Sequence, residues 1–140
     1  MVLENGATHR FTAEAIVETM TRRCSLLDIT ANQEAGATHL LRLVTRNLQH
    51  AESHMLLLGR KTAVEKVSAF LLEMDERLAH PKVMILPMSR RDIADYLGLT
   101  LETVSRALSI LRREKMLRFD GSTQRQIVLL DRGELAKLDA

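Results

Sequence analysis

Hydrophobic residues between Ser89 and Arg113 recur at the spacing of two short amphipathic helices joined by a tight turn. The apolar face of the first helix contains Ile93, Ala94 and Leu97. Gly98 comes next, where the chain must turn sharply and where a glycine adopts positive φ without steric cost. The residues predicted to be buried on the second helix are Val104, Ala107, Leu108 and Leu111. The pattern predicts a helix-turn-helix, and the alternative is an ordinary helical hairpin within a small core.

Polar residues precede each of these two helices and supply the predicted caps. Ser89, followed three residues later by Asp92, forms a capping box in which each side chain binds a free amide of the first turn. Thr100 holds the equivalent position before the second helix. Once the apolar stripe of the second helix is buried, the residues left facing outward are Glu102, Thr103, Ser105, Arg106 and Ser109.

Apolar residues at alternating intervals of three and four define a longer helix, from Gln33 to about Leu58. These residues are Leu41, Val44, Leu48, Ala51, Met55 and Leu58. Such a strict heptad seam implies a two-stranded coiled coil, so we expect the chain to form a homodimer through it. The alternative is that the seam packs on the rest of the same chain.

The remaining elements are shorter. Gly59 is expected to break the long helix, and a further helix is predicted over Lys61–Leu78. A short helical pattern lies near Ala13–Glu18, within a mixed segment from Met1 to about Asp28. Other predictions are a short strand at Met84–Leu86, a β-hairpin formed by Leu117–Phe119 and Gln126–Leu130, and a last helix over Arg132–Leu138. A hairpin directly after the second helix of a helix-turn-helix is a wing.

The composition agrees with this mainly helical reading. Of the 140 residues, 46% are hydrophobic but only 3% are aromatic, so aliphatic side chains must fill the interior, which suits helix packing. We therefore predict a mainly α fold with a small β wing: a long dimerisation helix followed by a winged helix-turn-helix domain. The predicted parts are an N-terminal segment at residues 1–28, the dimerisation helix at residues 29–59 and the winged helix-turn-helix domain at residues 60–140.

Charge and cysteine content narrow the function. Residues 81–140 hold eleven Lys and Arg against eight Asp and Glu, whereas residues 1–80 hold nine against ten. The positive excess thus accompanies the helix-turn-helix, as phosphate binding requires. A single cysteine, Cys24, excludes an internal disulfide and favours a reducing cytoplasm. Because no apolar run has the length of a membrane span, we expect no membrane association.

Exposed residues of the second helix have the chemistry to read DNA. In a helix-turn-helix the first turns of that helix meet base edges in the major groove. Glu102 and Arg106 are neighbours on one face and can read the two halves of one G·C pair, with Ser105 reading a neighbouring base. The alternative for Glu102 and Arg106 is a mutual surface ion pair. The candidate contacts to DNA phosphates are Ser89, Arg90, Thr100, Thr103, Arg118 and Arg125.

Other chemistry finds little support in the sequence. His50 and His54 have the spacing of two metal ligands, but no third ligand is evident. Cys24 beside Arg22 and Arg23 is a candidate redox-sensing thiol, and a plain structural thiol is the favoured alternative. No nucleophile with a base, phosphate loop or metal triad can be assembled, so we predict no enzyme and no cofactor.

These residues resemble the C-terminal two-thirds of the Crp/Fnr superfamily of bacterial transcription regulators. The resemblance runs through HRFTAEAI, MLLLGRKTAVEKVSAFLLEMDERL and LPMSRRDIADYLGLTLETVSRALS. Glu102, Ser105 and Arg106 form an E-x-x-S-R pattern that is similar to the Fnr/FixK branch. The resemblance implies a homodimer that reads a TTGAT-type palindrome in double-stranded DNA, serves microaerobic or nitrogen-fixation genes, and contacts RNA polymerase.

The chain departs from this family at its start. Members carry an N-terminal β-roll sensor domain, and residues 1–28 look like only its last strands. The resemblance therefore implies no small-molecule ligand, and we expect Leu43, Leu56 and Leu57 on the long helix to lose their cover. A second hypothesis is an interaction module that forms heterodimers with a full-length Crp/Fnr regulator and modulates it.

Overall fold

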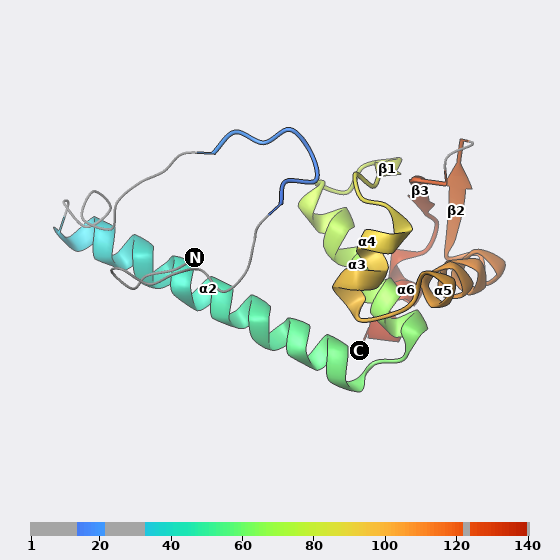
Figure 1. Ribbon diagram of the computed structural model, residues 1–140, viewed down its shortest axis with the longest axis horizontal. Helices are drawn as coiled ribbons and strands as arrows, with labels where there is room; N and C mark the ends of the chain where they lie inside the picture. The colour runs from blue at the N-terminus through green and yellow to red at the C-terminus, as the bar shows by residue number, and fades with distance from the viewer. Residues whose placement is uncertain (1–13, 22–32, 122–123, 140) are drawn as a thin grey trace. The chain divides into compact units, whose positions relative to one another are not determined.

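The computed structural model describes residues 14–21, 33–121 and 124–139. The chain divides into two units, Met1–Glu52 and Ser53–Ala140. The helices are α2 (Gln33–Arg60), α3 (Ala63–Arg77), α4 (Arg90–Leu97), α5 (Leu101–Arg113) and α6 (Arg132–Asp139). The strands are β1 (Met84–Ile85), β2 (Leu117–Asp120) and β3 (Gln126–Leu129) (Figure 1). The predicted fold class, mainly α with a small β wing, is confirmed.

Helix α2 confirms the long predicted helix but corrects its end. Gly59 was expected to break it, yet Gly59 lies inside the last turn and the helix ends at Arg60. A single glycine costs about 1 kcal/mol in a helix, which does not by itself end one. The break comes later because Thr62 and Glu65 form a capping box that begins α3, with the Thr62 amide donating to Glu65 Oε2 over 2.7 Å.

Helix α3 is the central helix of the unit Ser53–Ala140, and it packs against both α5 and α6. Its inward face carries Val67, Phe70, Leu71 and Met74, all of which are buried. The spacing of these residues places them on one side of the helix.

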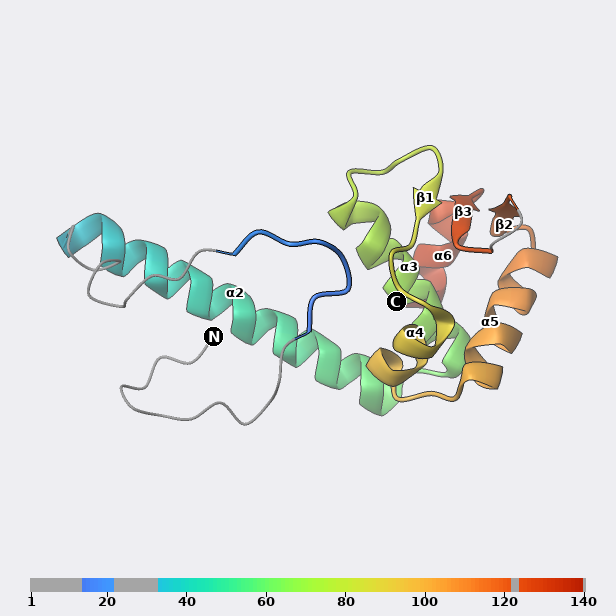
Figure 2. The ribbon, with the colours of Figure 1, turned by 45° about the horizontal axis from the view of Figure 1, so that its top comes forward.

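The helical hairpin forms as predicted. Ser89 caps α4, and its amide donates to Asp92 Oδ2 over 2.7 Å. The hydrogen bond from the Ser89 hydroxyl lowers the pKa of Asp92 below its usual value. Gly98 ends α4 with a left-handed backbone, φ 61°, and Thr100 then caps α5. Figures 1 and 2 show the short turn that joins the two helices.

The three strands form one antiparallel sheet in the order β1-β3-β2. Ile127 on β3 pairs with Met84 on one side and with Phe119 on the other. The buried sheet residues that join the core are Met84, Leu117, Ile127 and Leu129. The predicted hairpin and the short strand before it are therefore confirmed, and β1 extends the hairpin into a three-stranded sheet.

Two further expectations are corrected. Leu57 was expected to lose its cover, but it is 9% exposed and belongs to the core cluster of the C-terminal unit, whereas Leu56 is 56% exposed. Leu57 is covered because the last turns of α2, from Ser53 onward, belong to the same unit as that core. The helical pattern near Ala13–Glu18 is not realised, since residues 14–18 form no helix and are exposed. Without an apolar surface to bury, so short a segment gains too little to hold a helix.

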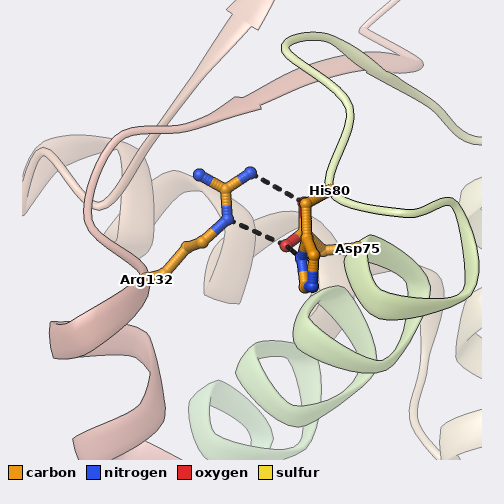
Figure 3. Close-up of polar contacts among 3 residues, drawn as sticks. All are labelled: Asp75, His80 and Arg132. Carbon is orange, nitrogen blue, oxygen red and sulfur yellow. Dashed lines mark hydrogen bonds and ion pairs between the residues drawn. The ribbon is translucent and has the colours of Figure 1, made fainter.

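A buried carboxylate ties the two ends of the C-terminal unit together. Asp75 near the end of α3 has a side chain only 2% exposed, and Arg132 at the start of α6 donates to its two oxygens over 2.8 and 2.9 Å. The Nδ1 of His80 lies 2.6 Å from Asp75 Oδ2. Figure 3 shows these three side chains facing one another. The hydrogen bond from Arg132 holds the pKa of Asp75 below its usual value of 3.8.

Replacing Asp75 by Asn is expected to lower the free energy of unfolding by about 2 kcal/mol at pH 7, because a bidentate bond to a charged group is lost. The native pKa of Asp75 is depressed, so its contribution is complete above pH 3.8 and is lost as the pH falls through the native pKa. The difference between wild type and Asp75→Asn should therefore shrink at acidic pH in urea denaturation. Asp120→Asn, which removes an exposed pair with Arg118, is the control and should change stability by less than about 0.5 kcal/mol. Equal effects of both substitutions would contradict this account.

Two glycine-to-alanine substitutions should change the stability of the chain in opposite directions. Gly98→Ala should destabilise the chain by about 1 kcal/mol, because alanine is strained at a positive φ although only ordinary van der Waals contact awaits its Cβ. Gly59→Ala should stabilise it by about 0.5 kcal/mol, because the site is helical and open. Urea midpoints measure both, and shifts in the same direction would disprove the assignment.

Candidate nucleic-acid interface

The outward face of α5 carries the residues that the sequence assigned to base reading. Val104, Ala107, Leu108 and Leu111 are each at most 3% exposed, so the opposite side of the helix must face solvent. Glu102 and Arg106 are both exposed on that side, and Ser105 between them is half-buried.

Glu102 and Arg106 do not neutralise each other. Among the residues that the structure describes, neither side chain forms an ion pair or a hydrogen bond with another side chain. The mutual surface ion pair considered from the sequence is therefore not formed. Glu102 also lies in the first turn of α5, where the positive end of the helix dipole stabilises a negative charge.

Ser105 is held by an arginine from the preceding helix. Arg90 Nη1 donates to Ser105 Oγ over 3.2 Å, and Arg90 Nη2 donates to Gln124 Oε1 in the wing. The guanidinium carbon lies 5.5 Å from the ring centroid of Phe119, a distance typical of a cation–π contact. Arg90 thus joins α4, α5 and the wing.

The hydroxyl groups proposed to bind phosphates first serve as helix caps. Thr100 Oγ1 accepts from the Thr103 amide over 3.2 Å and lies 2.9 Å from Thr103 Oγ1. Ser89 Oγ accepts from the Asp92 amide over 3.3 Å. Capping leaves the earliest amides of each helix directed outward, where an anion can bind them.

The wing brings further candidate residues near the start of α4. Ser89, Arg90 and Arg125 line one open pocket of about 290 Å³ with Gln124, so three of the proposed phosphate contacts come together there. Arg118 lies on β2 and pairs with Asp120 over 3.0 Å. The structure thus gathers Ser89, Arg90 and Arg125, whereas Arg118 has a local ionic partner on its own strand.

Sequence reasoning missed two residues of this surface, Gln124 and Phe119. Gln124 has a left-handed backbone with φ 53°, and its side chain reaches Arg90. Phe119 has Arg90 on its ring at 5.5 Å and Arg112 at 5.9 Å. Only the alternation of apolar residues in the hairpin marked Phe119, and nothing in the sequence marked Gln124.

The predicted heptad seam on α2 is largely exposed along this chain. Leu41, Leu48 and Met55 are 67%, 58% and 65% exposed, and Leu58 is 39% exposed. Ala51 is also exposed, and Val44 is half-buried. The larger seam residues therefore keep much of their apolar area available for a partner.

The other candidate chemistry gains little from the structure. In residues 14–21, 33–121 and 124–139, no three His, Cys, Asp or Glu side chains gather in a way that would hold a metal. The ring of His54 packs against that of Tyr96 with centroids 4.5 Å apart and the ring planes tilted by 34°. Cys24 lies outside the described residues. None of the helices described has the length and apolarity to cross a membrane.

Comparison with known protein families decides what kind of domain carries this surface. Residues 65–138 match the model of the Crp-like helix-turn-helix domain. The chain belongs to this family. The matched region contains the whole helical hairpin and both strands of the wing, so the candidate interface lies within the Crp-like domain.

Relatives within this family include the nitrogen fixation regulation protein FixK of Azorhizobium caulinodans, which is 41% identical over 98% of this chain and 58% of its own length. FixK of Rhizobium meliloti is 42% identical over 81% of this chain and 52% of its own length. The structure of FixK2 from Bradyrhizobium japonicum superposes with a TM-score of 0.75 and 57% identity, covering 82% of this chain and 57% of that one. The resemblance to the Crp/Fnr superfamily and its FixK relatives is thus confirmed. This chain spans a little over half the length of these relatives.

Proposed function

We propose that this Crp-like chain is a DNA-binding transcription regulator of the FixK/Fnr type that reads a palindromic site as a homodimer. The observation that carries this proposal is the outward face of α5, where Glu102 and Arg106 are exposed without a side-chain partner in the described part of the chain. Side chains of this kind on the first turns of a recognition helix are free to meet base edges in the major groove.

The chemistry of these side chains suits a G·C pair. A guanidinium donates two hydrogen bonds to guanine O6 and N7, and a carboxylate accepts one from cytosine N4. Arg106 and Glu102 are one helical turn apart, which lets them address the two bases of one pair. Ser105 then faces a neighbouring base.

Contacts to the DNA backbone fix the register of the helix. Ser89, Arg90 and Arg125 gather at one pocket as proposed contacts to one segment of the phosphate backbone, for which the two guanidinium groups supply hydrogen-bond donors. Thr100 and Thr103 at the start of α5, and Arg118 on the wing, are the other proposed phosphate contacts.

Dimerisation places two recognition helices on one duplex. The exposed seam of Leu41, Leu48 and Met55 is the proposed interface, with Val44, Ala51 and Leu58 completing it. A symmetric dimer then presents its two α5 helices to successive major grooves, about 34–36 Å apart, so the site it reads is a palindrome.

The names of the relatives suggest the genes that are served. Two of them are nitrogen fixation regulation proteins. We propose a TTGAT-type half-site, control of microaerobic or nitrogen-fixation genes, contact with RNA polymerase, and a cytoplasmic location.

Arg106→Ala tests base reading. In gel-shift titrations on a TTGAT-N4-ATCAA duplex, it should weaken binding by about tenfold or more per half-site, because its guanine contacts are lost. Binding to a scrambled duplex should change far less. Arg113→Ala removes the same charge from the far end of α5, where Arg113 is paired with Glu114, and serves as the control. Equal binding of wild type and Arg106→Ala to both duplexes would refute the proposed role.

Leu48→Glu tests the dimer. Wild type should sediment as a dimer and Leu48→Glu as a monomer, because a carboxylate would be buried in the seam. Gln49→Glu places the same charge on the adjacent, exposed position and should leave the dimer intact.

The exposed seam also favours a second candidate, heterodimerisation with a full-length Crp/Fnr regulator. A wild-type chain that is monomeric alone but exchanges into such a regulator would favour that candidate over the homodimer.

A further inference from the structure

We propose that Arg90 is a positioning residue that determines which base edge Ser105 reads, by holding the Ser105 hydroxyl as a hydrogen-bond donor toward DNA. This inference rests on the proposed function, and it assigns Arg90 a role in specificity in addition to any contact with phosphate.

The geometry of Arg90 supports this role. A guanidinium is planar and carries five N–H donors but no acceptor. Here one nitrogen donates to Ser105 on α5 over 3.2 Å, another donates to Gln124 in the wing, and the guanidinium carbon lies 5.5 Å from the Phe119 ring centroid. Three contacts to two different elements outside α4 hold the plane of the guanidinium in one orientation.

This orientation restricts what Ser105 offers to DNA. A serine hydroxyl has one proton and two lone pairs, and Arg90 occupies one lone pair. The adjacent positive charge opposes the approach of a second donor, so the hydroxyl proton is directed at an acceptor. The hydroxyl of Ser109 donates to the backbone carbonyl of Ser105 over 2.8 Å, so this bond does not involve the Ser105 hydroxyl.

Bases differ in whether their edges in the major groove offer hydrogen-bond acceptors or donors. Guanine presents O6 and N7 as acceptors and thymine presents O4, whereas cytosine presents its N4 amino group as a donor. Ser105 held by Arg90 should therefore prefer guanine or thymine over cytosine at the base that it faces.

A simple phosphate contact predicts something different. An arginine that only neutralises a phosphate strengthens binding to all sequences alike, and its loss reduces the salt dependence of binding by about one unit of slope. A positioning residue instead changes the preference at one base position. The two roles are therefore separable by experiment.

The test uses the full chain and a panel of palindromic duplexes in which each half-site position carries each base pair in turn. Fluorescence anisotropy measures every affinity for wild type, Ser105→Ala and Arg90→Met. Ser105→Ala identifies the position that Ser105 reads. At that position wild type should prefer guanine or thymine over cytosine by about fivefold, the size expected for one hydrogen bond.

Arg90→Met should abolish the preference at this same position. The double variant that combines Arg90→Met with Ser105→Ala should show the same base preference as Arg90→Met alone. Arg91→Met removes an equal charge from the adjacent exposed residue and should keep the wild-type preference. Arg90→Lys keeps the charge but cannot reach both partners with a planar fork, so it should also lose the preference while retaining the wild-type salt dependence. This variant answers the question if Arg90→Met proves unfolded by circular dichroism.

Two results would overturn the inference. If Arg90→Met or Arg90→Lys keeps the wild-type preference and only lowers all affinities evenly, Arg90 is a phosphate contact, and the proposed function stands. If wild type itself shows no base preference at any position, both the proposed function and this inference fail.

Discussion

Helix α5 buries Val104, Ala107, Leu108 and Leu111 against the rest of the C-terminal unit, and the orientation of the candidate interface depends on this packing. A helix with 3.6 residues per turn that buries one stripe has no freedom to rotate about its axis. Its opposite face, with Glu102 and Arg106, is then directed to solvent. The hydrophobic effect acting on one side of the helix thus positions the polar chemistry on the other.

The same unit limits how the hairpin can shift. Ala94 is small and 2% exposed, which suits the close approach of neighbouring helices, and Gly98 takes the left-handed conformation that the turn needs. Asp75 joins the end of α3 to the start of α6 through Arg132. Because α3 contacts both α5 and α6, this ion pair helps to hold the scaffold on which α5 rests.

In the role that we propose for it, Arg90 links base specificity to the protein scaffold. It begins α4, yet its partners lie on α5 and in the wing. A serine alone has a freely rotating hydroxyl that accepts or donates with equal ease. Fixing its partner before DNA arrives reduces the entropy lost on binding and favours one kind of base edge. On this proposal the wing, through Gln124, takes part in what α5 presents to DNA.

The sequence by itself determined the elements whose causes are local. The Ser89–Asp92 box, the Gly98 turn and the buried stripe of α5 depend on residues one to four positions apart, so periodicity and capping rules suffice to find them. Tertiary structure decided the contacts between distant residues: Arg90 meets Ser105 and Gln124 across 15 and 34 positions, and Arg132 meets Asp75 across 57. Such pairs leave no periodic trace in the sequence, because packing of whole elements brings them together. For the same reason Glu102 and Arg106 could be placed on the outward face from the sequence, whereas the half-buried, arginine-held state of Ser105 could not.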